Sequence, residues 1–80
     1  MQYIFQGMFD NLKRIRATIG YYVKQNKRLA ADDRLRILSG EETKHHKHIM
    51  DNMHRIEKLR NYYAQVVAQM QQQANIKHTS

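Results

Sequence analysis

The stretch 8–29, MFDNLKRIRATIGYYVKQNKRL, decides the fold, because its apolar residues recur at alternating steps of three and four. A second stretch, 49–70, IMDNMHRIEKLRNYYAQVVAQM, repeats the pattern, and the chain has no proline to interrupt either one. This spacing is helical and close to a heptad repeat, so each helix carries a mostly apolar stripe along one side. The first stripe consists of Met8, Leu12, Ile15, Ile19, Tyr22, Asn26 and Leu29, and the second of Ile49, Met53, Ile56, Arg60, Tyr63, Val67 and Met70.

The segment 30–40 breaks the first stripe and predicts a compact connector. The first long helix is expected to run from Tyr3 or Phe9 to near Leu29. Asp32 or Asp33 is a suitable N-cap for a short helical piece that follows. The apolar residues of that piece would plug the end of a hairpin; they are Leu35, Ile37 and Leu38.

A strong local signal marks the start of the second long helix. Ser39 and Glu42 have the spacing of a capping box, and Glu41 and Glu42 suit the positive end of a helix dipole. The helix is therefore expected to begin at Ser39 and to continue to about Gln73. Two long helices joined by a short connector predict an all-α, antiparallel helical hairpin.

The predicted hairpin forms a single domain over residues 8–73. Residues 1–7 are interpreted as a tag remnant or a flexible N-terminal turn, because Phe5, Gln6 and Gly7 resemble the end of a protease-cleavage site used in expression tags. Residues 74–80 have no apolar period and are expected to form a frayed polar tail.

Two striped helices leave too little core for an 80-residue chain, which has no cysteine to form a disulfide. Two hairpins are therefore expected to close into a dimeric four-helix bundle. Asn26 and Arg60 interrupt the stripes: buried, Asn26 would fix the register and Arg60 would need a carboxylate partner, or both lie near a solvated edge. The predicted interface comprises Leu12, Ile15, Ile19, Tyr22, Asn26, Ile49, Met53, Ile56, Tyr63, Val67 and Met70.

The chain is strongly basic: 14 Lys and Arg against 7 Asp and Glu give a formal net charge of +7. Such an excess favours phosphate backbones, anionic membranes or acidic protein surfaces. On each helix, basic residues recur opposite the stripe with one tyrosine among them, a mixture that suits nucleic acid. The predicted contacts are Lys13, Arg14, Tyr21, Lys24, Arg28, Lys47, Arg55, Lys58 and Tyr62.

Two other interpretations of these faces stay open. The same residues would suit a protein-docking adaptor or inhibitor, of the kind that phages and plasmids encode, that engages an acidic surface of a larger machine. They would also suit a merely solvated coat. A basic amphipathic membrane anchor near the N-terminus is disfavoured, because its apolar residues are needed for the bundle core.

Catalysis, metal binding and a helix-turn-helix are all disfavoured. Glu42 and His45 have the Glu-x-x-His spacing of dimetal bundles, but the first helix supplies no inward carboxylate to complete such a site. A helix-turn-helix over residues 32–52 would have a first helix of barely two turns. No catalytic constellation or phosphate-binding loop is present, so neither an enzyme nor a cofactor is expected. The lack of cysteine fits a cytoplasmic protein.

Overall fold

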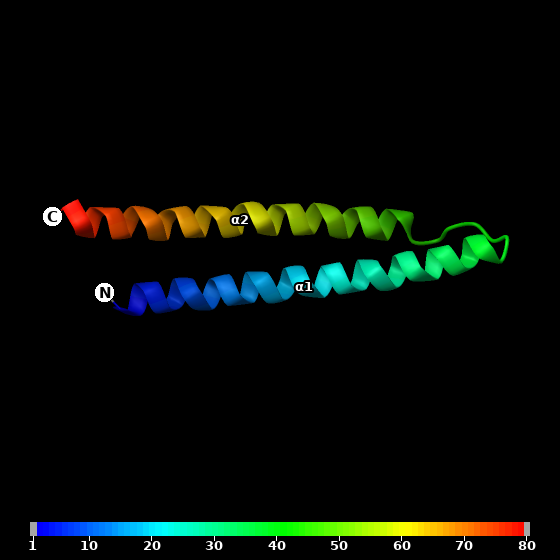
Figure 1. Ribbon diagram of the computed structural model, residues 1–80, viewed down its shortest axis with the longest axis horizontal. Coiled ribbons are helices and arrows are strands. Elements are labelled where there is room, and N and C mark those ends of the chain that lie inside the picture. Colours follow the sequence, from blue (N-terminus) through cyan, green and yellow to red (C-terminus); the bar gives the residue numbers. More distant parts are fainter. Residues whose placement is uncertain (1, 80) are drawn as a thin grey trace.

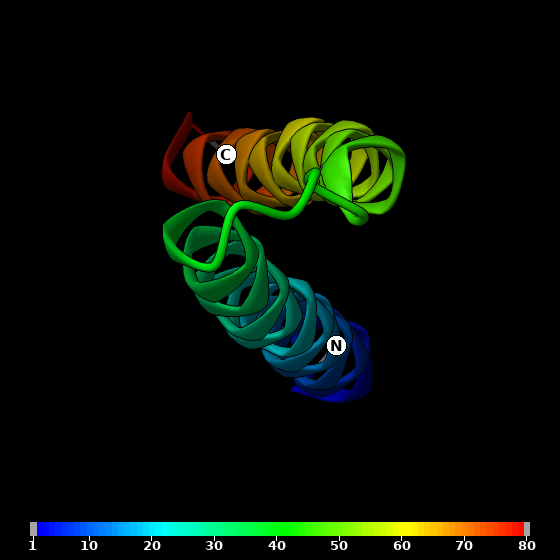
Figure 2. The same ribbon diagram turned by 90° about the vertical axis from the view of Figure 1, so that its right-hand side faces the viewer.

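The computed structural model describes the backbone of residues 2–79 and the side chains of residues 6–74. Its two helices, α1 (Gln2–Leu38) and α2 (His46–Thr79), run antiparallel in a hairpin of 66 × 16 × 13 Å, with both termini at the same end (Figure 1). Seen from the closed end, the helix axes are inclined to each other (Figure 2). The described backbone contains no strand. The predicted all-α helical hairpin is thereby confirmed.

Helix α1 does not end near Leu29 but continues to Leu38, so the predicted separate helical piece does not exist. The segment contains Ala30 and Ala31, which favour helix. Asp33 lies four residues after Leu29 and is buried, so the stripe continues instead of breaking. The three apolar residues predicted to plug the hairpin are exposed, Leu38 by 83%.

The end of α1 is a Schellman motif centred on Gly40, whose φ of 78° is in the left-handed region that favours glycine. The Glu41 N–H donates to the Arg36 carbonyl oxygen at 2.7 Å, and the Gly40 N–H donates to the Ile37 carbonyl oxygen at 3.0 Å. Ser39 is therefore the C-cap of α1. Its predicted role as the N-cap of the second helix is wrong, because Gly40 ends one helix where Ser39 was expected to begin the next.

Helix α2 begins at His46, seven residues later than predicted. It ends at Thr79, so helical backbone covers much of the predicted tail, whose side chains beyond residue 74 lie outside the described residues. Of the predicted N-terminal segment, the side chains of residues 1–5 lie outside them as well. Neither helix contains, among the described residues, a stretch apolar enough to cross a bilayer.

Four hydrophobic side chains are buried between the helices among the described residues: Leu12, Ile15, Ile56 and Val66. Half-buried side chains extend this contact into a seam at regular steps of four and three. On α2 the seam residues are His45 at the helix entry, then Ile49, Asn52, Ile56, Leu59, Tyr63, Val66 and Met70. The sequence pattern placed Met53, Arg60 and Val67 in this stripe, but the hairpin uses the residue before each of them. Met53 is 52% exposed.

An amide cluster fixes the register of the two helices. Asn52 is fully buried, and its Nδ2 donates to Asn26 Oδ1 and to Gln25 Oε1, both at 2.9 Å. Asn26 Nδ2 donates in turn to the Ile49 carbonyl oxygen at 3.3 Å. Sliding one helix along the other would leave these buried polar groups unpaired, which is unfavourable. Arg60 is exposed and needs no buried partner.

Candidate nucleic-acid interface

The two sides of the seam differ in chemistry. Residues directly before seam positions lie on one side of the hairpin, and those directly after them lie on the other. The preceding residues contain no aliphatic side chain. Over residues 11–28 and 48–69 they define what we call the polar side: Asn11, Arg14, Thr18, Tyr21, Gln25, Arg28, His48, Asp51, Arg55, Lys58, Tyr62, Gln65 and Gln69. Among the following residues, those that come directly after Met8, Ile15, Tyr22, Leu29, Asn52, Leu59 and Val66 lie nearest the seam. Together with Ala74 these are mostly apolar, and they define the apolar groove: Phe9, Arg16, Val23, Ala30, Met53, Arg60, Val67 and Ala74.

Contacts across the seam hold the polar side in place. Thr18 and Tyr22 of α1 line a shallow depression together with Arg55 and Lys58 of α2. The Arg55 guanidinium lies over the Tyr22 ring, 5.7 Å from its centroid, and Nη1 donates to Asn52 Oδ1 at 3.2 Å. A cation above an aromatic face is attracted by the ring quadrupole. Arg55 is thereby oriented while its side chain stays exposed.

The tyrosines of this side are also placed by neighbours. The Tyr62 hydroxyl accepts a hydrogen bond from Asn11 Nδ2 at 3.2 Å. The Tyr21 and Tyr22 rings meet edge to face, with centroids 5.4 Å apart and an interplanar angle of 70°. Tyr21 is nevertheless 61% exposed, so much of its side chain is accessible to a ligand. An exposed, oriented aromatic ring is a platform on which a base can stack.

A row of evenly spaced residues flanks this depression on α1. Arg14, Tyr21 and Arg28 lie seven residues apart, so they share one face, and each step is about 10.5 Å. Thr18, which lines the depression, falls between the first two. The whole row spans about 21 Å, equivalent to about six base steps of B-form duplex at 3.4 Å each.

Positive charge is concentrated on the body of the hairpin. Residues 11–31 carry six Lys and Arg and no Asp or Glu, and residues 52–80 carry four against one. Residues 32–51, around the closed end, carry four against five. A polyanion is therefore attracted to the length of the helices and away from the connector.

All nine side chains predicted to contact nucleic acid are exposed. Six of them gather on or beside the polar side: Arg14, Tyr21, Arg28, Arg55, Lys58 and Tyr62. The helical spacing puts Lys13, Lys24 and Lys47 about a quarter turn or more round their helices from it. Their role in binding stays a prediction.

Sequence reasoning missed Asn11, Gln25 and Asn52, whose amides make hydrogen bonds at the polar side. Asn11 donates to the Tyr62 hydroxyl, Gln25 accepts from Asn52, and Asn52 accepts from Arg55. Asn52 had a readable signal. It lies three residues after Ile49 and four before Ile56, and stepping on by three and four reaches Leu59, Tyr63, Val66 and Met70 without a polar break. Asn11 and Gln25 had none, because exposed amides are common on any helix.

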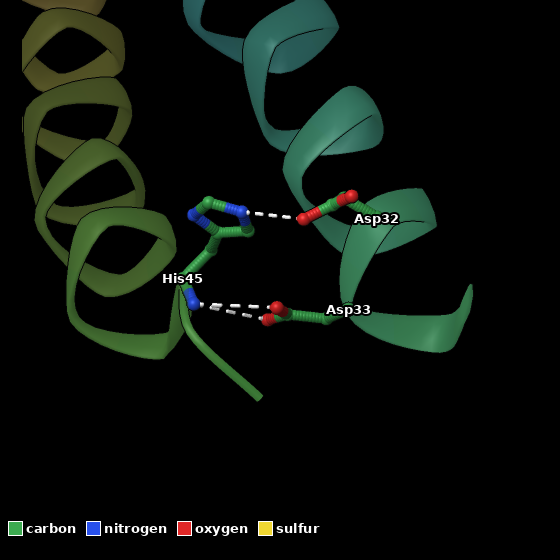
Figure 3. A group of neighbouring side chains, drawn as sticks. All are labelled: Asp32, Asp33 and His45. Carbon is green, nitrogen blue, oxygen red and sulfur yellow. Dashed lines mark hydrogen bonds and ion pairs between the residues drawn. The ribbon is translucent and has the colours of Figure 1, made fainter. Parts of the chain in front are cut away.

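A second polar cluster closes the hairpin. The Asp33 carboxylate accepts the His45 N–H at 3.3 Å (Figure 3). It also accepts the Lys44 N–H at 2.9 Å, so α1 caps the start of α2. Asp32 Oδ2 lies 2.9 Å from Arg36 Nε and 2.8 Å from His45 Nε2. The hydrogen bond from Arg36, with that from His45, lowers the pKa of Asp32. The hydrogen bond to Asp32, together with the negative charge of that carboxylate, raises the pKa of Arg36.

This closed-end cluster is explained as a structural clasp. Ligand atoms of Asp32, Asp33 and His45 lie within 4.8 Å of one another, a separation that would suit a metal ion. Backbone N–H groups already satisfy Asp33, however, and Arg36 and His45 satisfy Asp32. A cation would have to displace these donors. The cluster joins the two helices, and it lies at the end of the molecule where the excess positive charge is absent.

No protein-family model, curated protein or solved structure matches this chain. Function is therefore inferred from the chemistry of the two sides of the hairpin.

Proposed function

We propose that this hairpin is a small, non-enzymatic, cytoplasmic protein that binds DNA or RNA through its polar side, in an accessory or regulatory role. One observation supports this above all. Arginines and tyrosines alternate at fixed spacing along a stretch of α1 that has no carboxylate between Asp10 and Asp32. A surface that only keeps the protein in solution would not need arginines separated from carboxylates, because a surface of mixed charges does this equally well.

The charged and aromatic groups of the polar side are each suited to one kind of contact with nucleic acid. Arg14 and Arg28 neutralise backbone phosphates, and Arg55 and Lys58 do so from the facing helix. Tyr21 stacks on an unpaired base or packs against a sugar. None of these contacts reads a base edge, so the proposal is binding with little sequence preference.

Titration of the protein against a fluorescently labelled 20-base-pair duplex and a matching single strand, at two salt concentrations, tests the proposal. If about five phosphates are contacted, the slope of log K against log salt is about −4 to −5 on duplex. No binding to either strand form even at low salt would overturn the proposal.

A matched pair of double variants tests the face. Arg14→Gln with Arg28→Gln removes two charges from the polar side, whereas Lys27→Gln with Arg34→Gln removes two from exposed positions on the other flank of the same helix. We expect the first pair to reduce the salt slope by about 2 and the second to leave it nearly unchanged. Equal weakening by both pairs would show that net charge acts without a defined face.

The second candidate function is engagement of an acidic surface on a larger protein. Arginine and tyrosine are enriched at protein interfaces, so the polar side is chemically suited to that as well. Affinity capture from nuclease-treated lysate separates the two functions: a protein partner that persists, and that the Arg14→Gln, Arg28→Gln variant loses, would favour docking.

A further inference from the structure

The apolar groove is an open strip along the side of the hairpin away from the polar side. At the end of the strip nearer the connector, Val23 and Ile56 lie with Met53 around one hollow. Ile19 and Tyr63 form the floor of the next. The third is lined by Phe9, Leu12, Val67, Met70, Gln71 and Ala74. On α2 the strip extends from Met53 to Ala74, about 31 Å of helix.

The hairpin exposes far more surface than a compact monomer of its size. Its accessible area is 6807 Å², whereas a folded monomer of this mass is expected to expose about 5,100 Å². The excess, about 1,700 Å², is roughly twice what each partner buries in a standard protein interface. The elongated shape accounts for part of it, but half of the excess is enough for a stable dimer.

We propose that a second copy of this chain covers the apolar groove, so that two hairpins form a four-helix bundle. Helices in such bundles carry apolar residues at the two seam positions and at one flanking position. Here the flanking apolar residues all lie on the groove side, where Phe9, Val23, Met53 and Val67 follow seam positions. The same groove on two copies gives an isologous, closed contact.

The two arginines of the groove are compatible with this packing. Arg16 and Arg60 are both exposed, whereas Ile19 and Tyr63 between them are half-buried. Long arginine side chains can keep their charged ends at the rim while their stems cover apolar surface. Glu57, which lies beside Arg60 along the groove, offers a carboxylate to the rim of a facing copy.

Dimerisation through the groove leaves both polar sides on the outside of the bundle. Each hairpin would then present its own basic row, and the assembly does not depend on nucleic-acid binding. Failure of one proposal therefore leaves the other standing, and separate measurements test them.

Sedimentation of the wild-type protein over a range of micromolar concentrations is the first test. We expect a species of twice the 9.6 kDa chain mass and a melting temperature that rises with protein concentration. A folded single chain whose melting temperature is independent of concentration would overturn the proposal. That result would also be obtained if a different protein, and not a second copy, covered the groove.

Two variants that each add one negative charge test whether the two chains meet at the groove. Met53→Glu puts a carboxylate in the groove at a side chain that the hairpin itself leaves half exposed, and Gln65→Glu adds the same charge at an exposed position outside the groove. We expect Met53→Glu to weaken association at least tenfold and Gln65→Glu to change it less than twofold. A Met53→Glu dimer of wild-type affinity would exclude the groove as the interface, and far-UV circular dichroism checks that each variant is helical.

Discussion

The polar side and the apolar groove are built by the same two helices along the same seam, yet they suit different partners. On the polar side, Arg55 contacts Tyr22 and Tyr62 contacts Asn11 of the opposite helix, and both leave charged or aromatic surface outward. In the groove, Val23 and Met53 contribute apolar surface and have no such polar partners. The difference depends on position relative to the seam: the residues before seam positions are polar, and those after every second seam position, which line the groove, are mostly apolar.

This comparison shows how a two-helix chain can separate binding from assembly. A seam of heptad type fixes only which residues meet inside the hairpin. The flanking positions are free to differ, and the sequence places its aliphatic residues on one flank and its amides and tyrosines on the other. One face can thereby be buried against a second copy while the opposite face stays available to a polyanion.

Asn52 and Met53 give the largest expected contrast, because they are adjacent in sequence, yet Asn52 is buried in the seam and Met53 lies in the apolar groove. Asn52→Ala leaves Asn26, Gln25 and Arg55 without their amide partner and is expected to lower the free energy of unfolding by about 1–3 kcal/mol. Met53→Ala removes no hydrogen bond. Its effect is expected to appear only where chains associate.

Chemical denaturation at several protein concentrations measures both changes. The loss from Asn52→Ala should be similar at every concentration, whereas the loss from Met53→Ala should grow as the chains associate. Equal, concentration-independent losses would mean that Met53 acts inside the hairpin, contrary to its exposure.

A smaller effect is expected at Asp33, which keeps both sides in register by capping α2. Asp33→Ala removes the acceptor of the Lys44 and His45 N–H groups and should cost about 1 kcal/mol. Asp33→Asn keeps an oxygen acceptor and should cost less. Thermal unfolding followed at 222 nm measures both variants, and equal losses would mean that the charge, not the hydrogen bonds, is what matters.

Helical periodicity was sufficient to predict the class of fold. Two long helices with stripes, no proline and a short connector allow little else than a hairpin, and the structure confirms it. The first stripe was predicted residue by residue, because Leu12, Ile15, Ile19 and Tyr22 all lie at the seam. Strong local patterns of this kind depend on backbone geometry that every helix shares.

The boundaries and the second stripe were less predictable, because long-range contacts decide them. Ser39 has the sequence of an N-cap, but the left-handed conformation of Gly40 makes it the end of α1. The start of α2 is fixed by Asp33, a residue of the other helix, which no local motif could reveal. The second stripe was drawn through the apolar Met53, although the buried position belongs to Asn52, whose amide Asn26 and Gln25 satisfy.

The candidate interface was predictable in its residue types but not in its grouping. Net charge and exposed tyrosines pointed to the nine predicted contacts, and all nine are exposed. Which six share one side depends on how α1 and α2 face each other. That rotation follows from the seam, so the one-residue error on α2 also hid the difference between the polar side and the groove.

The smallest predicted effect is a pH dependence of stability, which arises from Asp32 at the closed end of the hairpin. Hydrogen bonds from Arg36 and His45 lower the pKa of Asp32 below its ordinary value of 3.8. A carboxyl whose pKa is lower in the folded than in the unfolded state stabilises the fold when ionised. That contribution is fully present above pH 3.8 and is lost as the pH falls through the lowered folded value.

We therefore expect the melting temperature to fall modestly between pH 5 and pH 2, and Asp32→Asn to remove part of that fall. Asp10→Asn, at the other end of the hairpin, is the matched control and should retain it. Because the Asp32 side chain is 46% exposed, water and salt screen the interaction, so the effect should shrink further at high ionic strength. An acid-induced fall of the same size in Asp32→Asn and in the wild type would show that the Asp32 carboxylate does not stabilise the hairpin, and that Asp33 and the amide cluster hold the two helices in register without it.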